Sequence, residues 1–310
     1  MIRGVMHVIF SVLAVGAAFL CAGSNLAWAF ERTHTCYPAQ DGRTPVCRKG
    51  QKSIPIQWRD GCTTWRNHSE FPDEHLDAVH HSFQTWNDVS GSYFRAFYAG
   101  STDQFGSGYD CKGGQSANEN VVSFVEHWPE SLAGSDVVAL TSVVYSIDTG
   151  EILDADIRMN AEHFKWQTIT HVTNDLSVVD VQNIMTHEVG HFLGLEHATE
   201  DNYLGRHRAS DATMYANTFP NEIKRRVLDA DDKAGVRAIY PVASAPSTPC
   251  EAPSPDHAAL PKDFDGARFQ CSAKRRGCRA SVASEFPASS WLLLFFALYA
   301  LRCRARRFRA

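Results

Sequence analysis

Residues 187–197 of the 310-residue chain read HEVGHFLGLEH, which is the pattern H-E-x-x-H-x-x-G-x-x-H. Residues four apart on a helix face the same way, so His187 and His191 can direct their imidazoles at one metal ion. A regular helix would carry the next histidine away from that ion. Gly194 tolerates a left-handed conformation, which can end the helix and turn the chain so that His197 supplies a third nitrogen. The pattern therefore predicts one zinc ion with three histidine ligands and a water in the fourth position.

Glu188 directly follows the first of these histidines. Zinc lowers the pKa of a bound water to about 7, so Glu188 can take its proton as the resulting hydroxide attacks a peptide carbonyl. The same carboxyl can then protonate the leaving amine, and no nucleophilic serine or cysteine is required. The alternative, an amphipathic helix that carries histidines by chance, is disfavoured because the full pattern arises in roughly one of ten thousand chains of this length.

The segment resembles the extended zinc motif of the metzincins, and within them of the matrixins, and the resemblance covers residues 72–241. Residues 211–215 read DATMY and resemble the methionine turn that follows this motif. The resemblance implies that Met214 forms an apolar floor beneath the histidines. Tyr215 directly follows the methionine, as in matrixins, so we do not expect it to be a ligand. Residues 30–72 lack the cysteine motif of matrixin pro-segments, so the mode of activation is open. His127, His163 and His171 lack the histidine spacing of the second, structural zinc of that family.

The implied fold is an α+β zincin: a twisted mixed β-sheet with a backing helix, an active-site helix, and a small C-terminal subdomain that holds the methionine turn. Hydrophobic spacing, turn residues and helix-start signals along the chain are consistent with this architecture. The elements that we expect are a helix over 72–89, a loop over 100–120, strands over 121–125, 137–145 and 152–159, a helix from Ser177 to Gly194, and a helix over 230–239.

Two further expectations come from the matrixin resemblance. The strand over 137–145 would be the sheet edge, where a protein or peptide substrate could bind as an added extended strand. Asp154 and Asp156 resemble residues of a strand that helps to bind structural calcium in that family. A calcium site needs six to eight oxygens, so a solvated strand face is the alternative for these two carboxylates.

The N-terminus has the composition of a signal peptide, residues 1–29. A basic start precedes an apolar run over 5–20, and Ala27-Trp28-Ala29 is a small-residue cleavage signal, which predicts export. The alternative is a permanent membrane anchor, although the run is shorter than the ~20 residues that a spanning helix needs. In an exported protein disulfides are expected, including within the N-terminal segment 30–71. Cys36, Cys47, Cys62 and Cys111 could form two bonds, with three pairings open. A further bond is possible between Cys250 and Cys271.

The chain beyond residue 241 differs in composition from the domain. Residues 242–285 are rich in proline and serine and are expected to form an extended spacer. Residues 286–310 combine an apolar stretch with an arginine cluster, which suggests membrane contact with a cytoplasmic end; a buried amphipathic piece is the alternative. Together with Gly277-Cys278 this tail resembles the C-terminal sorting tags of myxobacterial-type surface proteins, which implies cleavage and attachment near Cys278.

A net charge of −5 argues against a nucleic-acid partner. The zinc motif with Glu188, together with the export signal, predicts a secreted or surface-anchored zinc-dependent endopeptidase, located outside the cell or at its surface. One alternative is a surface-anchored binding module that keeps the zincin fold without turnover, against which Glu188 argues. Another is a zincin outside the metzincins, in which a downstream glutamate would replace His197 as the third ligand.

Overall fold

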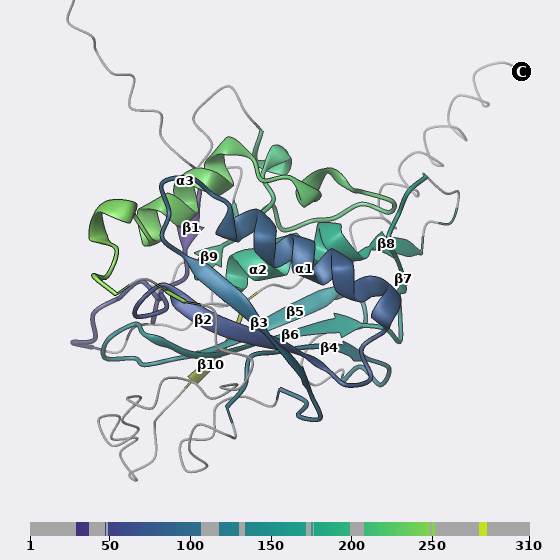
Figure 1. Ribbon diagram of the computed structural model, residues 1–310, viewed down its shortest axis with the longest axis horizontal. Helices are drawn as coiled ribbons and strands as arrows, with labels where there is room; N and C mark the ends of the chain where they lie inside the picture. The colour runs from purple at the N-terminus through teal and green to yellow at the C-terminus, as the bar shows by residue number, and fades with distance from the viewer. Residues whose placement is uncertain are drawn as a thin grey trace, which may run out of the picture.

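The computed structural model describes residues 29–36, 47, 49–106, 118–129, 134–171, 175, 177–198, 208–248, 250–251 and 279–283 (Figure 1). The expected signal peptide up to residue 28, the expected tail over 286–310, and Cys111, Cys271 and Cys278 lie outside these ranges. Within the described ranges, no helix combines the length and the apolar character that crossing a bilayer requires.

A six-stranded mixed sheet forms the centre of the fold, with the strand order β10-β5-β6-β4-β2-β3. β3, β2, β4 and β6 run parallel to one another, whereas β5 is antiparallel to both β6 and β10. The expected α+β class is therefore confirmed. The strands are β2 (Cys62–His68), β3 (Arg95–Thr102), β4 (Val121–Val125), β5 (Ala139–Tyr145), β6 (Ile152–Asn160) and β10 (Arg279–Ala283).

The strands over 121–125, 137–145 and 152–159 were expected, and β5 and β6 pair antiparallel as consecutive strands. β2 and β3 were not expected. In β2 the inward residues are Thr63, Trp65 and Asn67, so two of three are polar and hydrophobic alternation gives no signal. Because β2 is a central strand, the folded unit extends back across the boundary that we expected at residue 72.

Helix α1 (Asp73–Asn87) packs on the sheet, as the pattern over 72–89 predicts. Pro72 precedes its first turn, and two acidic residues there interact favourably with the helix dipole. Its apolar side is buried: the Phe83 ring stacks on Trp65 of β2 with centroids 4.4 Å apart. From the same side the indole of Trp86 donates to the carbonyl of Thr186 at 2.8 Å, so α1 contacts helix α2 (Val181–Phe192) directly.

Helix α2 begins at Val181 rather than at Ser177, where we expected it to begin. Residues Val178–Asp180 form β8, which pairs with β7 (Lys165–Gln167). The β-branched valines favour the strand, and Asp180 is the helix cap, accepting a hydrogen bond from the backbone N–H of Asn183 at 2.7 Å. Helix α3 (Ala230–Ile239) has the bounds that we predicted.

Several shorter elements complete the described fold. β1 (Glu31–Arg32) pairs with β9 (Leu195–Glu196), so the segment after Ala29 lies beside the end of the metal motif. Single helical turns follow at η3 (Ala209–Asp211), η4 (Lys224–Arg226) and η5 (Val242–Ser244).

Among the described cysteines, disulfides join Cys36 to Cys47 and Cys62 to Cys250. The second corrects two expectations: Cys250 does not pair with Cys271, and Cys62 does not pair within the set Cys36, Cys47, Cys62 and Cys111. The physical reason is that the chain after α3 returns to the start of β2. Within residues 242–285, where a spacer is expected, the described parts include η5, the disulfide at Cys250 and β10.

Candidate metal centre

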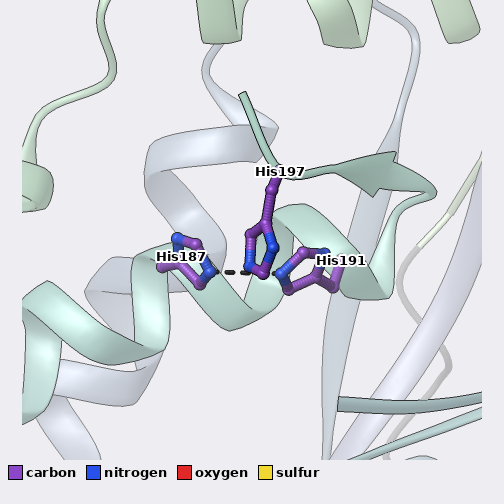
Figure 2. A group of neighbouring side chains, drawn as sticks. All are labelled: His187, His191 and His197. Carbon is purple, nitrogen blue, oxygen red and sulfur yellow. Dashed lines mark hydrogen bonds between the residues drawn. The ribbon is translucent and has the colours of Figure 1, made fainter. Parts of the chain in front are cut away.

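Three histidines converge at the end of helix α2. His187 and His191 project from successive turns, and their Nε2 atoms lie 3.1 Å apart (Figure 2). His197 reaches them from the segment after β9, and one ligand atom from each residue lies within 4.8 Å of the others. In a tetrahedral zinc site the nitrogens would stand about 3.3 Å apart, given a Zn–N distance of about 2.05 Å. The three-histidine group is therefore able to hold a metal ion.

Gly194 provides the turn that brings His197 back to the helix. Its backbone has φ of 108°, a left-handed conformation that residues with a side chain rarely adopt. A Cβ atom at this position would also lie 2.8 Å from the carbonyl oxygen of Ile56. The N–H of Gly194 donates to the carbonyl of His191 at 3.0 Å, which closes the helix. Glycine is needed here for both its conformation and its size.

Backbone carbonyls orient the two helical histidines. The Nδ1 atom of His187 lies 2.6 Å from the carbonyl of Thr213, and that of His191 lies 2.9 Å from the carbonyl of Leu195. A carbonyl only accepts, so each Nδ1 carries the proton and each Nε2 keeps its lone pair for a metal.

Burial keeps the three imidazoles uncharged at neutral pH. It holds the pKa of His187 and His197 well below the ordinary histidine value, and it lowers the pKa of His191 to about 4. Neutral imidazoles are the form that binds zinc. The donor set therefore fits zinc in charge state as well as in position.

Glu188 is fully buried beside the histidines. Its Oε2 accepts a hydrogen bond of 2.5 Å from the hydroxyl of Thr141 on β5, and the same hydroxyl lies 3.2 Å from the Glu188 carbonyl. Thr141 is itself buried, so strand β5 fixes the carboxylate from outside the helix. We did not identify Thr141 from the sequence, because only the tertiary pairing of β5 with α2 shows this contact.

Met214 is buried and packs against helix α2 at Gly190. A Cβ atom on Gly190 would collide with the Met214 sulfur, so this glycine allows the close approach. The backbone N–H groups of Thr213 and Met214 donate to the carboxylate of Asp232 on α3, at 2.8 and 3.1 Å. Burial raises the pKa of Asp232 to about 6. Gly190 and Asp232 are further residues of the site that sequence reasoning missed.

Arg225 on η4 also lies beside the site, with its side chain fully enclosed. Its Nη1 is 3.4 Å from Nδ1 of His187, and its Nη2 donates to the carbonyl of Asn217. Nε lies 3.5 Å from the carboxylate of Glu222, which supplies a compensating charge. No motif in the sequence distinguishes this arginine from the neighbouring basic residues.

Asp154 and Asp156 lie apart from the histidines, side by side on one face of β6. They are 2% and 1% exposed, so the alternative of a solvated strand face is wrong. Asp156 accepts a hydrogen bond from the N–H of Val121 at 3.0 Å. Burial, and then the charge of Asp156, raise the pKa of Asp154 to about 8. Among the residues that the structure describes, only the histidine group forms a metal-type cluster, so calcium binding stays a prediction.

Comparison with known proteins agrees with this geometry. Residues 140–241, from β5 to the end of α3, match the family model described as Matrixin. No curated protein gives a significant match. The matched segment contains helix α2, all three histidines, Thr141, Met214 and Asp232. Residues 140–241 are thus similar to the matrixins, a zinc metallopeptidase family, and the match supports a matrixin-like metalloprotease domain there.

Proposed function

We propose that the protein is an exported or surface-anchored zinc endopeptidase that hydrolyses internal peptide bonds. His187, His191 and His197 would hold the ion, and Glu188 would be the general base. One observation carries the proposal: three neutral imidazoles lie within ligand distance of one another, next to a buried carboxylate. A binding site alone has no need of that carboxylate, so this arrangement favours turnover over the alternative of a non-catalytic binding module.

The residues of the site divide the chemistry between them. Zinc, when bound, supplies a water of lowered pKa and polarises the scissile carbonyl. Glu188 takes the proton of the attacking water and returns it to the leaving amine. The Thr141 hydroxyl, 2.5 Å from Oε2, holds the carboxylate in one orientation during both transfers. Asp232 fixes the methionine turn, which in turn orients His187 through the Thr213 carbonyl.

Substrate would lie along β5 as an extended strand, on the side where β10 rather than an open edge lies in the structure. Its backbone hydrogen bonds would give affinity with little dependence on side chains. This position brings the scissile bond to the residue that contacts Glu188. Two disulfides among the described cysteines support export, since such bonds persist mainly in oxidising compartments. Surface attachment through the tail near Cys278 stays part of the proposal.

The test compares zinc content and casein cleavage for the full chain and for Glu188→Gln. The substitution keeps the size of the side chain and removes the base. We expect both proteins to bind one zinc and only the wild type to cleave. Glu74→Gln on the exposed side of α1 is the matched control and should behave as wild type. Zinc binding without cleavage by the wild type would favour the binding module instead.

A further inference from the structure

The sheet edge beside the metal centre is covered by the chain itself. β10 (Arg279–Ala283) pairs antiparallel with β5, and it is the short yellow strand labelled in Figure 1. Ala283 lies opposite Thr141, and Ser281 lies opposite Val143. Thr141 is the residue whose hydroxyl donates to Glu188. β10 thus runs along the expected substrate edge and ends beside the candidate catalytic base.

Hydrogen bonding on the other side of β5 shows which of its backbone groups face outward. The N–H of Asn160 on β6 donates to the carbonyl of Val138 at 2.9 Å, so Val138 faces β6. Along an antiparallel strand, the N–H and C=O groups of successive residues point alternately to one neighbouring strand and to the other. Thr141 and Val143, three and five residues further on, therefore turn their N–H and C=O groups away from β6 and towards β10. These are the groups that a bound substrate strand would use.

The same alternation assigns the backbone groups of β10. Ser281 and Ala283 stand opposite the outward residues of β5, so their N–H and C=O groups face that strand. Ala280 and Val282 direct theirs away from it. A proline therefore has opposite effects at adjacent positions: it removes a pairing donor at residue 281, whereas at residue 282 it lies where an edge strand tolerates proline.

We propose that residues 279–283 dock on β5 in place of a substrate strand and compete with substrate in cis. The proposal rests on the function proposed above, because it assigns an occupant to that site. An unpaired edge is a template for any extended chain, and a segment of the same molecule meets it at high effective concentration. A covered edge would restrain the enzyme without requiring the cysteine motif that residues 30–72 lack.

The experiment uses the full chain as wild type, Ser281→Pro and Val282→Pro. Backbone hydrogen exchange is measured at Thr141 and Val143, which face β10, and at Leu140 and Ser142, which face β6 and are internal controls. Cleavage of casein is measured on the same preparations loaded with zinc. We expect faster exchange at the two outward amides in Ser281→Pro only, and casein cleavage about tenfold faster in that variant, from the loss of backbone pairing.

The outcomes separate the two proposals. Rapid exchange at Thr141 and Val143 in the wild type, or equal behaviour of the two proline variants, would overturn the docking of β10. A cut within residues 279–283 that Glu188→Ala abolishes would overturn competition, because the segment would then be a substrate. The expected exchange pattern without cleavage by any variant would sustain docking and refute the proposed endopeptidase function.

Discussion

Thr141→Val tests whether strand β5 holds the catalytic carboxylate. The change replaces a hydroxyl by a methyl group of similar size and removes the 2.5 Å hydrogen bond to Oε2 of Glu188. Both side chains are fully buried, so water does not readily replace the lost donor. A hydrogen bond to a charged group contributes about 1.5–3 kcal/mol, which corresponds to a decrease in kcat of about tenfold to a hundredfold.

The assay is cleavage of a quenched fluorescent peptide between pH 5 and 9, with zinc content measured in parallel. Loss of a donor to the ionised carboxylate raises its pKa, so the acidic limb of the rate profile should move to higher pH. Thr141→Ser keeps the hydroxyl and should keep both rate and profile. Ser142→Ala, on the opposite face of β5, should also be close to wild type. A Thr141→Val enzyme with unchanged kcat and an unchanged acidic limb would refute the role assigned to this hydroxyl.

Three further predictions concern the glycine turn, the buried acidic pair and the longer disulfide. Gly194→Ala should lower both Tm and zinc affinity because it meets strain and a clash, whereas Gly50→Ala, which has φ of 86° and open space, should lower Tm only slightly. Asp154 has a folded pKa of about 8, above its unfolded value, so its contribution to the free energy of unfolding of the metal-free chain is lost as pH rises from about 4 to 8. Asp154→Asn should remove this loss in urea titrations, and it should abolish any rise in Tm that calcium produces at pH 8. Cys250→Ser opens a loop of 188 residues and should lower the free energy of unfolding by about 5 kcal/mol, by chain entropy alone. Cys36→Ser opens a loop of 11 residues and should lower it by about 3 kcal/mol. Equal urea midpoints for the two variants would contradict this order.

The ligand set was predictable from the sequence because it is local. Periodicity within one helix places His187 and His191 on one face, and Gly194 accounts for the return of His197. The residues that support them come from distant segments. Thr141 lies on β5 and Asp232 on α3, and only the packing of these elements against α2 reveals their contacts.

The fold was predictable where hydrophobic spacing was regular, as in α1, β4 and α3. It was not predictable in β2, whose buried positions are largely polar. Nor was it predictable for β10, because the spacer around it has few apolar residues and backbone pairing with β5 leaves no side-chain pattern.

The central claim is that one zinc ion at the three histidines drives peptide-bond hydrolysis. The most direct measurement titrates the full chain, stripped of metal by a chelator, with zinc. Cleavage of the fluorescent peptide reports the activity at each zinc concentration. We expect activity to be absent after stripping, to return in full at one equivalent, and to stay absent in His197→Ala at the same zinc concentration. Cleavage that persists after the metal is removed, or that His197→Ala recovers at one equivalent, would contradict the account.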